Sequence, residues 1–211
     1  MPSPSLPTWK AWNRNLHVYL GLYFLVFLWL FAVSGLLLNH GWRFTEFWSK
    51  RQQSTREHVI QPPHVTDDLG QAKEVMSQLD LAGEIEWTTV QPAAEGFSFR
   101  VVRPGRIVDV TADLGRRTAT VQETRVNGWG MVRMLHTFSG RLANTTRAER
   151  DWLWTRLWSF AMDALAVGLI VLVAGSLILA YERRERWAGS AAVLSLGLAV
   201  WAFFVFGLRW L

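Results

Sequence analysis

The sequence predicts an α-helical membrane protein that has three transmembrane helices and a small α+β domain between the first two. Three long apolar windows and one polar insertion carry this prediction. The windows are Val18–Asn39, Leu157–Tyr181 and Trp187–Leu208, each at least 22 residues long. About 20 residues are enough to cross a hydrocarbon core of ~30 Å. A helix also satisfies its own backbone hydrogen bonds in lipid.

The first window predicts a retained membrane anchor. Its apolar run is longer than the roughly 7–15 residues of a signal-peptide core, and no small-x-small cleavage site follows it. Among the three windows, Asp163 is the only Asp, Glu, Lys or Arg. We expect the helices at residues 16–40, 152–181 and 187–209.

Basic residues in the short flanking segments predict the orientation. Lys10 and Arg14 lie in the tail 1–15, and Arg183, Arg184 and Arg186 lie in the turn 182–186. Short cytoplasmic segments of membrane proteins carry an excess of Lys and Arg. We therefore expect the N-terminus in the cytoplasm and residues 41–151 on the far side of the membrane, which is the periplasm if this is a bacterial inner-membrane protein.

Composition excludes several classes of function. A net charge of +5 and a pI of about 10.2 are explained by cations that face lipid headgroups, so we expect no nucleic-acid partner. The chain has no cysteine, which excludes disulfides, cysteine zinc sites, iron–sulfur clusters and covalently attached haem. The phosphate-, dinucleotide-, zinc- and serine-hydrolase motifs are also missing. Histidines and Asp163 are left as candidates.

The insertion predicts a linker, a helix and a small sheet. Residues 50–68 are polar and contain a Pro-Pro pair, which is typical of a linker. Helical spacing of apolar residues predicts an amphipathic helix over 69–79. Alternation between 84 and 122, with turn signals at 104–105 and 114–115, predicts about four short antiparallel strands. The segment 127–142 is expected to be a helix along the membrane surface.

Two histidines are expected at the outer face of the membrane. His17 and His40 are 40 − 17 = 23 residues apart, about 35 Å along a helix, so they mark opposite faces and cannot bind one metal ion. His136 shares the outer side with His40. Two neutral imidazoles from different helices can bind a b-type haem. A metal ion, or histidines that merely tolerate the interface beside an aromatic belt, are the alternatives.

The other candidates are weaker. His58 and His64 lie in the predicted linker and are expected to be solvated, although a metal-handling role together with His40 and His136 stays open. Asp163 is costly in lipid, so we expect it to face the helix bundle. There it could orient a histidine, relay a proton, or make a structural interhelical hydrogen bond.

In their order, these pieces resemble the PepSY-associated transmembrane-helix proteins of bacteria, in a short three-span form. The resemblance is carried by His17 with Gly21, by Ser34 and Gly35 followed by Asn39 and His40, by Leu135 and His136, by Asp163, and by Phe97–Gln122 as PepSY-like strands. Larger members of that family include inner-membrane reductases that release iron from ferric siderophores and carry b-type haem on transmembrane histidines.

The resemblance implies that His40, His136 and also His17 bind haem and that electrons pass to a periplasmic acceptor such as a ferric siderophore. One chain can make a single two-histidine site, so a ligand that pairs with His17 would come from a homodimer or another subunit. No segment resembles a flavin or nicotinamide domain, so electrons would come from a membrane partner or quinol. The alternative is a non-enzymatic, membrane-anchored PepSY module that binds or regulates a periplasmic partner.

Overall fold

The computed structural model describes residues 8–41, 51–91, 96–138, 150–182 and 187–207. The chain divides into two compact units. One consists of Met1–Val26 and Asp163–Leu211, and the other of Phe27–Met162. Each unit is described by itself.

Among the described residues, three helices are long and apolar enough to cross a membrane, namely α1 (Trp9–Asn39), α5 (Leu153–Glu182) and α6 (Trp187–Phe206). Helix α5 lies within one residue of the predicted 152–181. Helix α1 begins at Trp9, whereas the sequence predicted residue 16, because the first two turns carry Lys10 and Arg14 and so lie outside the apolar run. The predicted basic turn at 183–186 lies outside the described residues.

In the first unit, α1 and α5 pack through glycines. The buried face of α5 consists of Leu165, Gly168, Leu172 and Gly175, which recur every three or four residues and therefore share one side of the helix. The ring of Phe24 lies on Gly168, where an added Cβ would come within 2.1 Å of Cε2. Asn13 donates its amide N–H to the carbonyl of Gly175 at 3.2 Å. Small residues allow such close approach of two helices.

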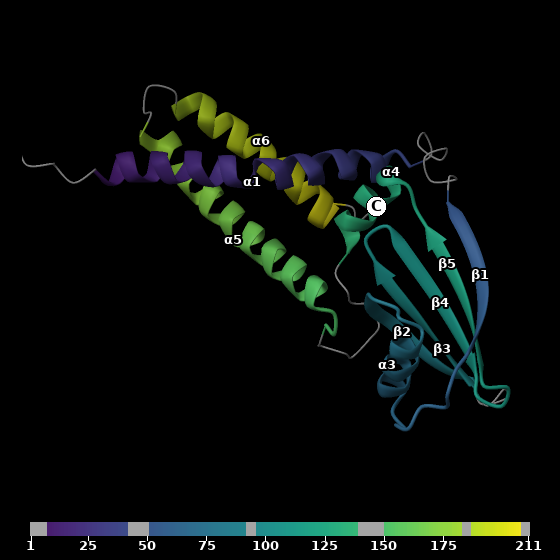
Figure 1. Ribbon diagram of the computed structural model, residues 1–211. Helices are drawn as coiled ribbons and strands as arrows, with labels where there is room; N and C mark the ends of the chain where they lie inside the picture. The colour runs from purple at the N-terminus through teal and green to yellow at the C-terminus, as the bar shows by residue number, and fades with distance from the viewer. Residues whose placement is uncertain (1–7, 42–50, 92–95, 139–149, 183–186, 208–211) are drawn as a thin grey trace, which may run out of the picture. The chain divides into compact units, whose positions relative to one another are not determined.

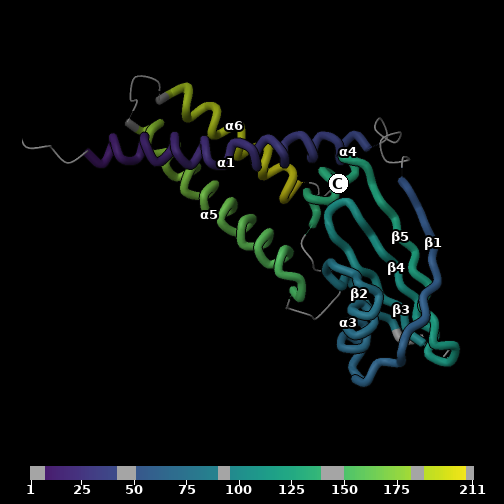
Figure 2. The backbone as a smooth tube through the Cα atoms, in the orientation of Figure 1, coloured from purple at the N-terminus to yellow at the C-terminus, as the bar shows by residue number. Residues whose placement is uncertain are grey.

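The second unit contains an antiparallel sheet of five strands in the order β1-β5-β4-β3-β2 (Figures 1 and 2). The strands are β1 (Gln52–Val59), β2 (Glu84–Gln91), β3 (Gly96–Arg103), β4 (Arg106–Asp113) and β5 (Thr118–Arg125). Helix α3 (Asp68–Gln78) lies against one face of this sheet, and α4 (Gly128–Thr137) follows β5. The predicted helix over 69–79 is thus confirmed.

The core of the sheet lies on the face that α3 covers. Successive side chains of a strand point to opposite faces, so Phe97, Phe99 and Val101 share one side of β3. Their partners on β4 are Ala112, Val110 and Val108. Ala72 and Val75 of α3 complete the cluster. All of these residues are buried, and Phe99 is 0% exposed.

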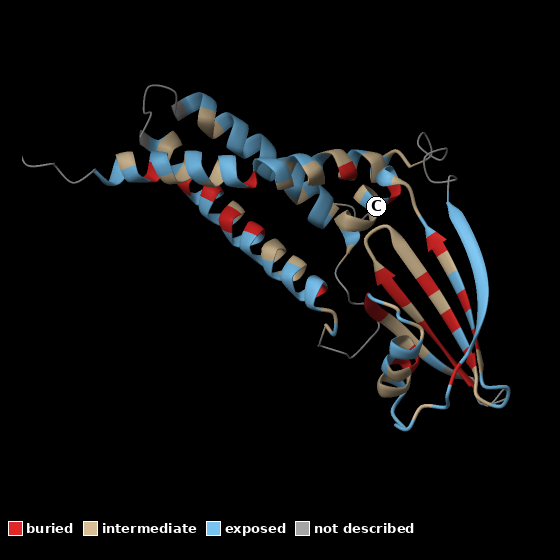
Figure 3. Cartoon of the chain, viewed as in Figure 1, coloured by how far each residue is buried: buried red, intermediate tan, exposed pale blue. Residues whose placement is uncertain are grey.

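Strand β1 corrects the prediction of a linker over residues 50–68. All eight of its residues are exposed (Figure 3), and its register with β5 pairs Thr55 with Gln122 and His58 with Ala119. The strand has no apolar alternation because backbone hydrogen bonds to β5, and not burial, hold it in the sheet. The sheet therefore has one strand more than predicted, and His58 lies on a strand, exposed.

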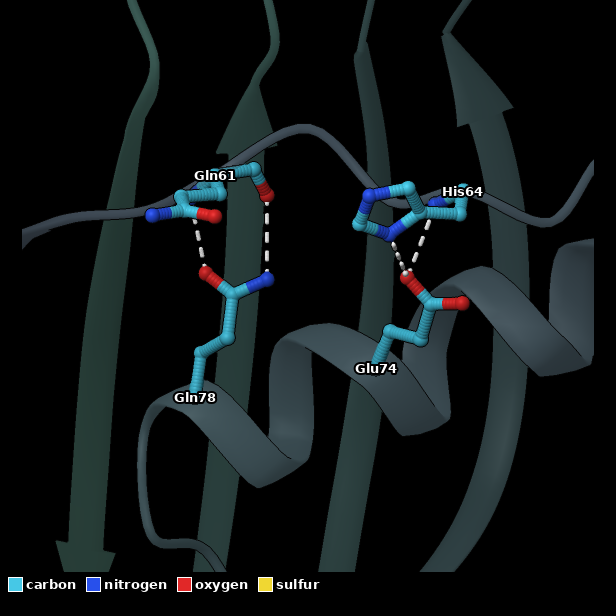
Figure 4. A network of polar contacts seen from close by, with 4 residues as sticks. All are labelled: Gln61, His64, Glu74 and Gln78. Atoms are coloured by element: carbon cyan, nitrogen blue, oxygen red, sulfur yellow. Dashed lines mark hydrogen bonds and ion pairs between the residues drawn. The ribbon is translucent and has the colours of Figure 1, made fainter.

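The connection from β1 to α3 is bound to that helix by polar contacts (Figure 4). Gln78 accepts from the backbone N–H of Gln61 at 2.7 Å and donates to its carbonyl at 3.0 Å. Glu74 accepts from the backbone N–H of His64 at 2.8 Å, and Nδ1 of His64 lies 3.3 Å from the same oxygen. His64 remains exposed, as predicted, but its backbone is anchored.

Glu123 of β5 lies between two arginines. Burial acts to raise the pKa of Glu123, but hydrogen bonds from Arg125 and Arg106 outweigh it and hold this pKa below the ordinary value of 4.5. Arg106 donates from Nη2 at 2.9 Å. A carboxyl whose pKa is lowered by folding stabilises the folded state above its unfolded pKa, and this contribution is lost as the pH falls through the folded pKa.

We therefore expect acid to weaken the β4–β5 pairing through Glu123. Amide protection factors of these strands should fall as the pH drops below about 4.5, and Glu123→Gln should flatten that dependence. The measurement is hydrogen exchange with intrinsic rates corrected for pH, on the full chain in detergent. Glu57→Gln on the exposed strand β1 is the control and should keep the wild-type profile. An unchanged acid dependence in Glu123→Gln would contradict this account.

Candidate functional site

Helix α4 positions His136 in the second unit. The helix begins after Asn127, whose side chain accepts from the N–H of Gly130 at 2.9 Å, as an N-cap residue does. Val126 donates to the carbonyl of Gly105 at 3.0 Å, which ties the start of α4 to the β3–β4 turn. Helix α4 covers part of the predicted surface helix at 127–142, and residues 139–149 lie outside the described residues.

The imidazole of His136 contacts one face of α1. Its Nδ1 lies 2.7 Å from Oγ of Ser34, which is 0% exposed. Its ring meets the ring of Phe31 edge-on, with centroids 5.2 Å apart. A Cβ on Gly35 would lie 3.5 Å from Cε1 of the ring. Phe31, Ser34 and Gly35 share a face because residues three and four apart on a helix are neighbours.

His40 is anchored to its own helix. Nδ1 of its half-buried ring lies 3.1 Å from the carbonyl oxygen of Leu36, one turn earlier. Six residues separate Ser34 from His40, which is about 9 Å along the helix and about 120° around it. The structure thus gives His136 polar and ring contacts with Ser34 and Phe31, and gives His40 its hydrogen bond with Leu36.

A b-type haem would be held by two histidines that each keep one ring nitrogen free for the iron. By donor chemistry, His40 and His136 fit this requirement: both are half-buried, and within the described part of the chain each ring is hydrogen-bonded through Nδ1 alone. Among the described residues there is no group of three or more His, Cys, Asp or Glu that could hold a metal ion.

His17 belongs to the first unit. Its Nδ1 is buried and has no hydrogen-bond partner among the described residues. A Cβ on Gly175 would lie 3.8 Å from this nitrogen and 2.9 Å from Oδ1 of Asn13. His17, Asn13 and Gly175 therefore form a small polar cluster between α1 and α5. His17 is the only histidine in the sequence of this unit.

Asp163 differs from its prediction, since it lies exposed on α5 and does not face the bundle. Gly168 lies on the buried side of α5, against the ring of Phe24. Asp163 precedes Gly168 by five residues, about 140° around the helix. The α1–α5 contact through glycine therefore turns Asp163 outward.

Sequence reasoning missed two residues. Ser34 was noted only as part of a Ser-Gly motif, although a hydroxyl in an apolar run followed by glycine is a usable signal for a contact. Nothing in the sequence indicated that Glu84 of β2 is buried, because an acidic residue that alternates with apolar residues usually faces solvent. It is 1% exposed, and its carboxylate accepts from the backbone N–H groups of Asp151 and Trp152, each at 3.0 Å.

No protein-family model, no curated protein and no solved structure matches this chain.

Proposed function

We propose that this chain is a bacterial inner-membrane redox protein that binds b-type haem through His40 and His136. It passes electrons outward to a periplasmic acceptor such as a ferric siderophore. The observation that carries this proposal is the anchoring of the His136 ring on α1, by Ser34 and Phe31, near the end of the helix that His40 directly follows. Histidines that bind a metal commonly have their other ring nitrogen held by a hydrogen bond, and the contact with Ser34 agrees with this pattern.

The apolar surfaces of the helices support a membrane location. Helix α6 has none of its apolar window buried inside the chain, and α1 has 11% buried. In water these surfaces would be costly, whereas a bilayer covers them at no such cost. Basic residues in the tail 1–15 and in the turn 182–186 favour a cytoplasmic N-terminus. With that orientation the sheet domain lies in the periplasm.

The haem and the residues around it would have separate roles. When bound, haem supplies a reversible one-electron carrier. His40 and His136 would hold its iron as neutral imidazoles, and Ser34 and Leu36 orient the two rings. The electrons would arrive from a membrane partner or quinol. His17 would take part only if a homodimer or another subunit provides a second ligand. The resemblance to PepSY-associated membrane proteins supports the same assignment.

An absorption spectrum of the purified chain tests the proposal. Protein from haem-replete cells should show a Soret band whose position changes on reduction with dithionite. His40→Ala and His136→Ala should each remove most of the bound haem, because each would delete one of the two imidazoles that would hold its iron. His58→Ala on the exposed strand β1 is the matched control and should keep full haem content. A colourless wild-type protein would refute the proposal.

The second candidate is a non-enzymatic PepSY-like module that binds a periplasmic partner. The sheet face opposite α3 favours it, because Arg100 there lies over the ring of Trp87 at 5.6 Å and pairs with Asp109 at 2.6 Å. Tryptophan and arginine are common anchors of protein interfaces. A colourless protein whose activity in cells survives His136→Ala but not Trp87→Ala would establish this function in place of the first.

A further inference from the structure

We infer that Ser34 is a positioning residue whose hydroxyl keeps the proton of His136 on Nδ1 and so makes Nε2 the metal-binding nitrogen. The inference about metal binding rests on the proposed haem site. The inference about the proton does not, since it follows from hydrogen-bond geometry alone. The two can therefore fail separately.

The location of the hydroxyl proton follows from the contacts of Ser34. Its Oγ lies 2.6 Å from the carbonyl oxygen of Leu30 and 3.2 Å from that of Phe31. A carbonyl oxygen can only accept, and a serine has one proton to donate. If that proton pointed elsewhere, two oxygen acceptors would face each other at 2.6 Å. The hydroxyl of Ser34 therefore donates to Leu30.

The proton of His136 follows from that of Ser34. With its own proton committed, Oγ can only accept in its contact with Nδ1 at 2.7 Å. Nδ1 must then carry the N–H, and in the neutral ring Nε2 has the free lone pair. Ser34 is 0% exposed, so water does not compete for this bond. Hydrogen bonds in such surroundings are electrostatically strong.

Gly35 and Phe31 are the other neighbours of the His136 ring on α1. A Cβ on Gly35 would lie 3.5 Å from Cε1, an ordinary van der Waals distance, and the ring of Phe31 meets the imidazole edge-on. If the ring rotated by half a turn, a carbon would face Oγ of Ser34 and the hydrogen bond would be lost. The hydrogen bond to Ser34 therefore favours one orientation of the ring as well as one tautomer.

A different hydrogen bond sets the same tautomer in His40. Its Nδ1 lies 3.1 Å from the carbonyl oxygen of Leu36, which can only accept, so this Nδ1 also carries its proton. Histidines that bind metals commonly donate the other ring N–H to a fixed acceptor, which sets the ligand nitrogen and its basicity. Both histidines therefore present Nε2, one through a hydroxyl and one through a backbone carbonyl.

Nitrogen-15 NMR of ring-labelled histidine, on the haem-free full chain at a pH where the ring is neutral, tests the proton assignment. We expect a protonated Nδ1 and an unprotonated Nε2 for His136. Ser34→Ala should shift the population towards the other tautomer, and Ser34→Thr should restore the wild-type spectrum. A wild-type ring protonated mainly at Nε2, or no change in Ser34→Ala, would overturn the inference.

Haem titration tests the consequence for binding. Ser34→Ala should weaken haem binding by about 10–100-fold and shift the midpoint potential, while Ser34→Thr stays close to wild type. Ser176→Ala is the matched control, because Ser176 on α5 also donates to the carbonyl four residues earlier, at 2.8 Å, and should have no effect. Wild-type protein that binds no haem would refute the proposed function and leave the NMR result standing. Wild-type affinity and potential in Ser34→Ala would refute the positioning role alone.

Discussion

Replacing Glu84 with alanine is expected to release the segment before α5 from the sheet domain. The carboxylate makes two charge-assisted hydrogen bonds to the backbone N–H groups of Asp151 and Trp152. Each such bond contributes roughly 1.5–3 kcal/mol. Loss of about 3 kcal/mol in local stability should make these two amides exchange about 100-fold faster. Hydrogen exchange of the full chain, read at Asp151 and Trp152, is the measurement.

Two further variants sharpen this result. Glu84→Gln should lie between wild type and Glu84→Ala, because an amide keeps one acceptor oxygen but turns an NH₂ group towards a backbone N–H. Glu57→Ala on the exposed strand β1 should leave both amides at their wild-type rates. Lys73 also holds this segment, through an ion pair with Asp151 at 2.8 Å. If exchange in Glu84→Ala matched that in Glu57→Ala, the ion pair and not the carboxylate would be the main attachment.

Replacing Gly168 with alanine is expected to push α1 and α5 apart. The new Cβ would meet the ring of Phe24 at 2.1 and 2.5 Å, and that ring is 5% exposed and has little space to move. Overpacking of this kind costs roughly 1–3 kcal/mol. The midpoint of thermal unfolding in detergent, followed by circular dichroism, should fall accordingly.

The same substitution elsewhere provides the control. A Cβ on Gly197 of α6 has no atom within 4 Å, so Gly197→Ala should leave the midpoint unchanged. Phe24→Ala removes the obstructing ring, and in that background Gly168→Ala should no longer destabilise the protein. The coupling in this double-mutant cycle measures the contact directly. Additive effects of the two substitutions would show that the ring and the glycine do not meet.

The elements that the sequence predicted well are those with a strong periodic signal. The three apolar helices, the helix over 69–79 and the strands with alternating apolar residues carry their burial pattern in their own residues. Strand β1 was missed for the opposite reason. Its side chains are all exposed, so its strand conformation depends on backbone pairing with β5. The residues of β1 themselves carry no pattern that indicates this pairing.

The candidate site divides in the same way. His40 and His136 could be selected from the sequence because few other residues remained once cysteine and the common motifs were excluded. Their polar partners could not be found, since Leu36 contributes a backbone carbonyl and Ser34 is 102 residues from His136. Asp163 was predicted to face the bundle because a charge in lipid is costly. The contact between Phe24 and Gly168 instead turns it outward.

The sequence by itself determined the class of the chain: three apolar helices, a small α+β insertion and histidines near the ends of the first helix. These features depend on composition and periodicity, which are local. Tertiary structure alone decided which nitrogen of His136 carries the proton, which side of α5 meets α1, and where the carboxylate of Glu84 binds. Each of these depends on atoms that are distant in the chain and meet only when the helices and the sheet have packed.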